Sequence, residues 1–518
     1  MKSDAGKTDS IWTATTDIPV GVQLTEDAQT NVCIVGAGIA GMTTAYLLAK
    51  EGVSVVVLED GVVASGETGR TTAHLSFALD DRYIELERLH GERGAQLAAE
   101  SHQTAVTQIE TIVREENIDC DFSRLDGYLF SGPGQDIEEL DEELEAAQRA
   151  GVPGVRRVDH APIEGFNTGA ALLFPNQGQF HPVKYMAGVA AAIERLGGRI
   201  HTRTHVVSIE GGERPWVKTE GGQTIRANAV VVATNSPVND WLTIHTKQAP
   251  YRTYVIGALV PKGAIPKALY WDTLDPYHYV RLQPHSDTHD CLIVGGEDHK
   301  TGQADDTESR FDRLEAWTRK VFPHVQVVEY RWSGQVMEPV DGLAFIGRNP
   351  GDENVYIATG DSGHGMTHGT IAGMLIRDLI HNRDNEWTKI YDPARKSVKS
   401  LGEFTKENLN VAAQYVDYVT GGDVKDADEI ANGSGAVLRR GLQKIACYKD
   451  DSGVVHELSA ICPHLGCVVD WNKTEKTWDC PCHGSRFTAL GKVVNGPANS
   501  DLTPADDDEP VAPIPVVQ

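Results

Sequence analysis

The chain has 518 residues, too many for one ordinary core, and this length suggests about three folded units. No stretch approaches the roughly 20 consecutive apolar residues of a membrane span, and no export signal stands at the N-terminus, so a cytoplasmic protein without a membrane span is expected. Its 74 acidic and 47 basic residues give a net charge of -27, which argues against binding to nucleic acid.

The first regular element is a strand, tight turn, helix and strand at residues 31–58. Gly36, Gly38 and Gly41 form G-x-G-x-x-G directly after the first strand, and Glu59 ends the second. The glycines allow a tight turn, close approach of the backbone to a pyrophosphate, and close helix packing, while the acid would accept hydrogen bonds from a ribose. A structural glycine turn alone would not explain the acid, so the unit predicts a dinucleotide site.

Further elements follow in chain order. An acid-rich stretch with helical spacing covers about residues 80–150, and strand patterns occupy about residues 199–236. A β-rich segment at about 252–296 predicts a second sheet. Residues 340–380 read as turn, strand, glycine-rich loop and helix, which indicates a return to the first sheet.

The part of the chain after residue 400 differs in composition from what precedes it. Residues 401–419 have helical spacing and predict a connecting helix, whereas residues 420–435 are polar, acidic and glycine-rich, as in a linker. Short strands and turns follow around two cysteine motifs, CPHLGC at 462–467 and CPCHGS at 480–485. Half of the eight cysteines of the chain therefore lie within 21 residues.

These motifs predict a metal centre. Each offers one thiolate and one imidazole in close spacing, Cys462 with His464 and Cys480 with His483. Such a set could bind a structural zinc ion. Zinc would leave Cys467 and Cys482 unexplained.

Two glycine-rich loops supply further candidate cofactor contacts. The stretch GVVASGETGRTTAHLS carries Arg70, Thr71 and Thr72, and ATGDSGHGMTHG near residue 360 brings a second set of exposed backbone N–H groups. Two such loops suit a long, buried cofactor.

Residues 28–385 resemble FAD-dependent oxidoreductases of the D-amino-acid-oxidase and glycine-oxidase type. The resemblance rests on the fingerprint ending in glutamate, the TGRTTA loop, THVVSIE followed by VVVATNSP, and the closing DGLAFIG and ATGDSGHGMTHGTIAG stretches. It implies that the backbone of Val206 contacts the adenine and that Arg70, Thr71 and Thr72 lie near the pyrophosphate and flavin. It also implies that a loop lies beside the isoalloxazine, with the candidate contacts Gly360, Gly363, Gly365, Met366 and Thr367.

Residues 431–518 resemble the disulfide-bearing type of Rieske [2Fe–2S] domain, in which one iron takes two cysteines and the other two histidines. The resemblance implies that Cys462, His464, Cys480 and His483 are the cluster ligands and that a disulfide joins Cys467 to Cys482. It further implies that residues 495–498, NGPA, shield the cluster. Phe487 stands where high-potential relatives carry a tyrosine hydroxyl, so a lower potential is expected, because hydrogen bonds to sulfur raise it.

No catalytic acid or base stands out. Tyr279 and Arg281 alternate onto one strand face, where the arginine could clamp a substrate carboxylate, although a solvated face explains the pattern equally well. His364 is a third weak candidate, in the flavin-facing loop. Together with Asp361 and His368 it mimics a mononuclear iron site. Lining of the flavin pocket explains these residues better.

The expected fold is an α/β FAD-binding domain of the Rossmann-like, glutathione-reductase type with an inserted antiparallel β-sheet substrate domain, plus a small all-β Rieske domain. The expected order is an N-terminal segment, 1–27; the flavin domain, 28–385; a connecting helix and linker, 386–430; and the Rieske domain, 431–518. Within the flavin domain, FAD-binding parts are expected at about 28–80, 160–245 and 330–385, and substrate-domain parts at about 81–159 and 246–329.

The predicted function is that of an FAD- and Rieske [2Fe–2S]-dependent oxidoreductase. An amine or amino-acid-like small molecule would be oxidised at the flavin, and the cluster would pass single electrons to an external protein or quinone. In one alternative, an external donor reduces the cluster, which then reduces the flavin for reduction or oxygenation of a substrate. In another, the protein is a redox sensor or electron carrier without turnover, which predicts a filled or closed cavity above the flavin.

Overall fold

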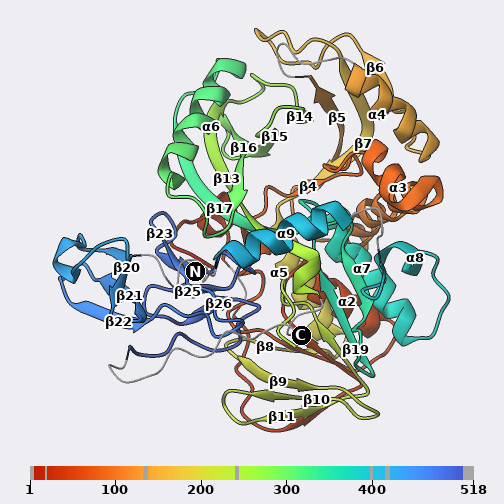
Figure 1. The fold of residues 1–518 in the computed structure, drawn as a ribbon. Helices are drawn as coiled ribbons and strands as arrows, with labels where there is room; N and C mark the ends of the chain where they lie inside the picture. The colour runs from red at the N-terminus through yellow and green to blue at the C-terminus, as the bar shows by residue number, and fades with distance from the viewer. Residues whose placement is uncertain are drawn as a thin grey trace.

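The structure is a computed structural model that describes residues 5–17, 20–131, 138–239, 244–396, 401–414 and 421–505. Figure 1 shows a large body built on two main sheets, with the C-terminal strands forming a separate lobe against its side. No helix within these ranges is long and apolar enough to cross a membrane.

The dinucleotide half is a six-stranded sheet in the order β18-β19-β12-β2-β3-β8. Its strands are β2 (Val32–Val35), β3 (Val55–Leu58), β8 (Arg199–His201), β12 (Ala229–Val232), β18 (Phe345–Arg348) and β19 (Val355–Thr359). Strands β2 and β3 are parallel and buried at every position, which explains their continuous apolar text. Helices α2 (Ile39–Lys50), α5 (Pro182–Arg195) and α7 (Gly365–Ile380) belong to this half, with α2 packed against both of the others.

A four-stranded sheet extends this half. It comprises β1 (Ala28–Gln29), β9 (Val206–Glu210), β10 (Trp216–Thr219) and β11 (Thr224–Arg226), in the order β1-β11-β10-β9. The expected strands at 199–236 and the return of the chain to its first sheet after residue 340 are both confirmed.

The second sheet has nine strands, eight of them in the order β17-β13-β16-β15-β14-β5-β7-β4, with β6 paired to β7. The strands are β4 (His74–Leu75), β5 (Ser123–Phe130), β6 (Arg156–Val158), β7 (Ala171–Gln179), β13 (Gln248–Pro261), β14 (Leu269–Asp272), β15 (His278–Pro284), β16 (His289–Lys300) and β17 (Val328–Pro339). The helices α3 (Tyr83–Glu115), α4 (Glu138–Arg149) and α6 (Thr307–Val321) accompany it, and α8 (Thr388–Tyr391) contacts α3.

This sheet departs from the sequence analysis in three ways. The stretch expected to be helical from 80 to 150 contains β5, because SRLDGYLF is a half-buried strand between two helices. The sheet is also not wholly antiparallel, since β14 pairs with β5 in parallel. Finally, β7 and most of β17 come from stretches that we expected in the FAD-binding parts, because strand partners distant in sequence complete the sheet.

The C-terminal lobe is all β, as expected. One sheet comprises β20 (Ser434–Arg440), β21 (Gln443–Lys449) and β22 (Val455–Ser459), and the other β23 (Asp470–Asn472), β24 (Thr477–Asp479), β25 (Arg486–Thr488) and β26 (Val493–Asn495). Four cysteines and Phe487 lie in its apolar core. The lobe therefore builds its core around the cysteine motifs.

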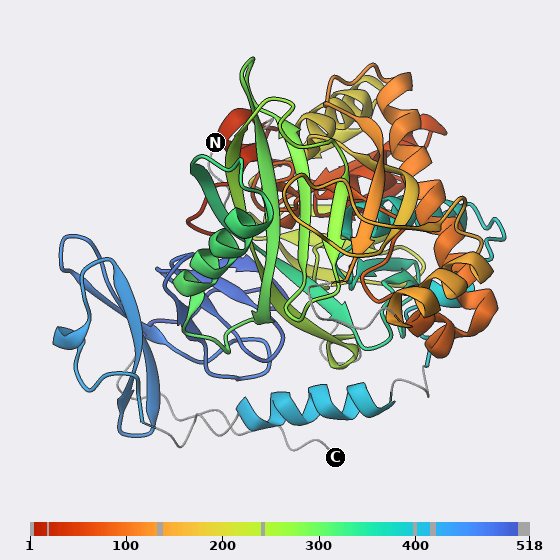
Figure 2. The same cartoon turned by 90° about the horizontal axis from the view of Figure 1, so that it is seen from above.

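Two peripheral segments tie the lobe to the flavin part. The connecting helix expected at 401–419 is present as α9 (Leu401–Gln414), and the rest of the expected range lies outside the described part of the chain. Figure 2 shows α9 running along one edge of the molecule toward the lobe. At the other end of the chain, Lys7 donates its N–H to the carbonyl of Glu475 at 2.9 Å, and α1 (Ile11–Thr15) places Trp12 to donate to the carbonyl of Thr71 at 2.6 Å.

Candidate active site and cluster site

The dinucleotide turn joins β2 to α2. Gly36 has a φ of 104°, and a Cβ there would meet the carbonyl oxygen of Ala233 at 2.3 Å, so only glycine fits. Gly38 caps α2, while Gly41 lies behind the turn against Gly36. Glu59 follows β3 and accepts hydrogen bonds from the backbone N–H groups of Ala37 at 2.6 Å and Gly61 at 3.0 Å. The carboxylate is therefore held at the mouth of the turn.

A cavity of about 310 Å³ runs from this turn to the nine-stranded sheet. Most of the predicted cofactor and pocket residues line it: Gly36, Gly38, Glu59, Arg70, Thr71, Thr72, Val206, Gly360, Gly363, Gly365, Met366, Tyr279 and His364. Gly41, Thr367 and Arg281 are not among the described residues that line it. Thr367 instead contacts the buried His102 at 2.9 Å.

Arg70 borders the cavity, but its guanidinium group binds other protein groups and not a cofactor. Its side chain is 1% exposed and pairs with Glu475 of the Rieske lobe at 3.0 Å. It also donates to the carbonyl of Ser333 at 3.0 Å and to the carbonyl of Thr8 at 2.9 Å. Arg70 therefore joins the N-terminal segment, the flavin part and the Rieske lobe.

Arg281 is likewise occupied. It donates to the carbonyls of Ala73 and Phe180 at 2.9 Å each and to that of Thr72 at 3.2 Å. These bonds stabilise the loop that carries Thr72, so the position of Arg281 does not support a clamp on a substrate carboxylate. Tyr279, by contrast, faces the cavity and lies 2.5 Å from the hydroxyl of Thr253.

The loop before α7 does not form the iron site that its residues mimic. His364 accepts the N–H of Asp80 at 2.9 Å, while His368 lies 2.8 Å from the carbonyl of Asp361 and 3.2 Å from His102. Among the described residues, one group has the spacing of ligands to a single metal ion, and it consists of three cysteines of the Rieske lobe. Asp361, His364 and His368 do not belong to that group. Gly363 has a φ of 71° in the turn of this loop.

The two cysteine motifs converge in the Rieske lobe. Cys462 and Cys480 are buried within hydrogen-bonding range of each other, and the rings of His464 and His483 have centroids 5.1 Å apart. In a zinc site all four ligand atoms would lie within about 4 Å of one another. No three of these four ligand atoms lie that close together. A [2Fe–2S] cluster has two irons with two protein ligands each, so its four ligand atoms need not surround a single point. The residues present therefore fit a [2Fe–2S] cluster better than zinc.

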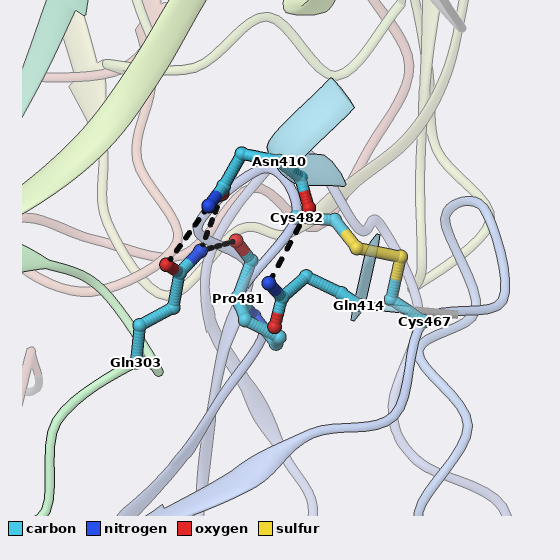
Figure 3. Close-up of a disulfide and its surroundings, with 6 residues drawn as sticks. All are labelled: Gln303, Asn410, Gln414, Cys467, Pro481 and Cys482. Atoms are coloured by element: carbon cyan, nitrogen blue, oxygen red, sulfur yellow. Dashed lines mark hydrogen bonds between the residues drawn. A yellow bond between two sulfur atoms is a disulfide. The ribbon is translucent and has the colours of Figure 1, made fainter. Parts of the chain in front are cut away.

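The predicted disulfide between Cys467 and Cys482 is confirmed. Figure 3 shows it beside a small polar contact with α9, in which Gln303 donates to the side chain of Asn410 at 2.8 Å and to the carbonyl of Pro481 at 3.2 Å. The bridge thus ties the two cluster loops together, while Gln303 fixes one of them to the flavin part.

The histidine edge of the cluster site faces the flavin part. His245, in the single turn η2 (His245–Lys247), is 2% exposed, and its ring centroid lies 4.9 Å from that of His464 and 6.0 Å from that of His483. The chain continues directly into β13, where Gln248 donates to the hydroxyl of Thr359 at 3.2 Å. Since Thr359 lines the cavity, a short path leads from the cluster histidines to the cofactor cavity.

The loop that we expect to shield the cluster also reaches this cavity. Its lining includes six residues of the Rieske lobe: Val493, Val494, Asn495, Gly496, Ala498 and Asn499. Asn495 donates to Glu67 at 3.4 Å, and the carbonyl of Asn499 lies 3.4 Å from the ring of His205. The Rieske lobe therefore forms part of the wall of the flavin site.

A buried ion cluster holds this interface. Glu475, between β23 and β24, is fully buried and pairs with Arg70 at 3.0 Å and Arg252 at 3.5 Å. Thr8 adds an N–H donor at 3.1 Å and a hydroxyl donor at 2.6 Å. Burial raises the pKa of Glu475, but Arg70, Arg252 and Arg486 together outweigh burial and bring that pKa to about 2. The carboxylate is therefore ionised at neutral pH.

Sequence reasoning missed His245, Glu475 and the acids Asp80 and Asp298 of the cavity wall. His245 is a lone histidine and Glu475 lies in the polar run NKTEKT, so neither carries a local pattern. Their roles become visible only through contacts with residues that lie hundreds of positions away in the chain.

Family comparisons agree with this geometry. The family model described as FAD dependent oxidoreductase matches residues 31–379, and that of the Rieske [2Fe-2S] domain matches residues 422–506. The Rieske 2Fe-2S iron-sulfur protein YhfW of Bacillus subtilis (strain 168) is 32% identical over 503 residues, which is 96% of this chain and 98% of that protein. The gamma-glutamylputrescine oxidoreductase of Escherichia coli (strain K12) is 28% identical over 375 residues, 69% of this chain and 85% of the relative.

Among solved structures, glycine oxidase from Geobacillus kaustophilus shares the fold, with a TM-score of 0.61, 18% identity, and coverage of 71% of this chain and 99% of that chain. The flavin domain binds FAD and the C-terminal domain binds a [2Fe–2S] cluster. With the fingerprint, the cavity and the paired cysteine loops in place, the chain belongs to the FAD dependent oxidoreductases and carries a C-terminal Rieske [2Fe-2S] domain.

Proposed function

We propose that this enzyme oxidises an amine or amino-acid-like substrate at the flavin and delivers the electrons through its own Rieske cluster to an external one-electron acceptor, a protein or a quinone. The observation that carries this proposal is the contact of His245 with both cluster histidines, together with the Rieske residues in the cavity wall. Both cofactor sites thus share one interface within the chain.

The chemistry divides between the two groups. When bound, FAD accepts a hydride equivalent and the cluster passes on single electrons. The substrate would lose that hydride from the carbon beside its nitrogen, with the nitrogen unprotonated, and would leave as an iminium ion, so each turnover would supply two electrons, taken up singly by two equivalents of acceptor, and release one proton. A substrate that binds as an ammonium ion gives up one further proton before the hydride leaves.

The buried cluster histidines affect where a partner can dock. Because His464 is 8% and His483 4% exposed, an external acceptor would take electrons from another surface of the Rieske domain. The direction of electron flow and a cytoplasmic location stay predictions.

The test is anaerobic stopped-flow spectroscopy of the holoenzyme with a panel of amines and amino acids. The proposal predicts bleaching of the flavin followed by reduction of the cluster. If no compound bleaches the flavin, while chemically reduced cluster does, the electrons enter through the Rieske domain and the proposed direction is refuted.

A further inference from the structure

The cavity has an acidic end, formed by the nine-stranded sheet and the loop before α7. Three carboxylates line it, Asp80, Asp298 and Asp361. Three aromatic side chains share this wall: Trp271, Tyr277 and Tyr279. Two further acids, Asp81 and Glu338, both contact the hydroxyl of Ser362 close behind it.

Positive charge is scarce there. The described lining contains no lysine, and its one arginine, Arg70, is 1% exposed and paired with Glu475. Burial lowers the pKa of His74 to about 3, so this lining histidine is neutral. His364 can offset only one of the acids. A bound carboxylate would therefore meet like charges and no free guanidinium.

Asp80 is placed to meet a ligand. Its side chain keeps 26% of its exposure although it lies inside the protein, because it borders the cavity, and the hydroxyl of Tyr277 donates to its Oδ2 at 3.4 Å. Burial raises the pKa of Asp80, but the neighbouring His364, 3.5 Å away, and Arg82 together outweigh burial and lower that pKa. The carboxylate is thus ionised at neutral pH.

Asp298, at the end of β16, supplies an unfilled acceptor. Its Oδ1 is shielded from solvent and makes no hydrogen bond to any residue that the structure describes. Burial raises the pKa of Asp298 to about 7. A buried oxygen without a donor is unfavourable, so a ligand N–H that donates to this Oδ1 would remove that unfavourable contribution.

We propose that this end of the cavity binds the substrate as a cation, an amine without a carboxylate on its reacting carbon, with Asp80 as its counter-charge and Asp298, which ionises as the cation binds, as a second. This inference rests on the proposed oxidation at the flavin and narrows its substrate class. The rings of Tyr277 and Tyr279, with centroids 5.5 Å apart, add faces that attract an ammonium group. The site thus differs from one that clamps an amino acid through an arginine.

The test compares amines with their α-carboxylated counterparts: butylamine with norvaline, benzylamine with phenylglycine, and 1,4-diaminobutane with ornithine. Dissociation constants come from calorimetric titration of the oxidised, anaerobic holoenzyme, and flavin bleaching is recorded separately. At least one amine should bind tenfold or more tightly than its counterpart. Asp80→Asn and Asp298→Asn should each weaken binding of that amine at least tenfold, whereas Asp305→Asn, at an exposed position of the same part of the chain, should not.

The outcomes separate the two proposals. Equal or tighter binding of the amino acids, no binding by any compound, or amine affinity unchanged in both cavity variants would each overturn the cation site. Amines that bind as expected but never bleach the flavin would support the cation site and refute the proposed oxidation. The amine and amino acid comparison needs no variant, so a variant that fails to fold leaves the test intact.

Discussion

Replacing Glu475 with glutamine should destabilise the docked Rieske domain far more than removal of an ordinary surface charge. Glutamine keeps the volume and the hydrogen-bonding oxygen, but leaves the buried guanidinium groups of Arg70 and Arg252 without a counter-charge. Breaking a buried ion pair by removing one partner costs about 3–5 kcal/mol. The fall in the pKa of Glu475 from 4.5 to about 2 gives a similar figure, about 3 kcal/mol at about 1.4 kcal/mol for each pKa unit.

The assay is urea unfolding of the holoenzyme followed by circular dichroism of the cluster. A matched control is Glu457→Gln, in the same domain. Glu457 pairs with Arg440 at 2.9 Å, and the two side chains are 28% and 52% exposed, respectively. We expect the control to lose under about 1 kcal/mol. Equal, small losses in the two variants would refute the account of the interface.

The ion cluster around Glu475 also predicts that the free energy of unfolding depends on pH. Because the pKa of Glu475 is lower in the folded protein than in the unfolded chain, its stabilisation is fully present above about pH 4.5 and is lost as the pH falls toward about 2. The difference in unfolding free energy between the wild type and Glu475→Gln should shrink over that interval. A difference that stays constant down to pH 3 would contradict the assigned pKa.

Three further changes test the cluster side. His245→Leu should slow reduction of the cluster by the flavin and leave flavin bleaching unchanged in stopped-flow traces, because the ring between the cofactor sites is lost. Phe487→Tyr should raise the cluster potential by about 40 mV in a redox titration, the value of one hydrogen bond of about 1 kcal/mol. The double variant Cys467→Ser with Cys482→Ser opens a loop of 15 residues and should cost about 3 kcal/mol, seen as loss of the cluster at lower temperature. An unchanged transfer rate, potential or melting temperature would contradict the respective prediction.

The sequence predicted those parts of the site whose residues are close neighbours along the chain. The turn from Gly36 to Gly41 ends a buried strand and begins a helix, so its spacing carries the whole geometry. The cysteine motifs are equally local, and their disulfide was predicted and is present. By contrast, a substrate role for Arg281 was considered because strand alternation predicts which face of the strand a side chain lies on. It does not predict the backbone carbonyls that bind the guanidinium group in the structure.

Contacts between distant segments were beyond local patterns. The pairing of Arg70 with Glu475 joins positions 405 residues apart, and nothing in TGRTTA indicates that its arginine turns toward the Rieske lobe. The strand β5 was missed for a related reason, since its partners β7 and β14 come later in the chain. Such residues acquire a role only when the fold brings their partners together.

The most direct test of the central claim, that FAD and the cluster exchange electrons within one chain, is flash photoreduction of the flavin in the anaerobic holoenzyme. The EPR signal and visible absorbance of the cluster are then followed in time. The docked interface predicts that the cluster is reduced as the flavin is reoxidised, at a rate independent of protein concentration. A rate proportional to protein concentration, or a cluster that stays oxidised, would contradict the account.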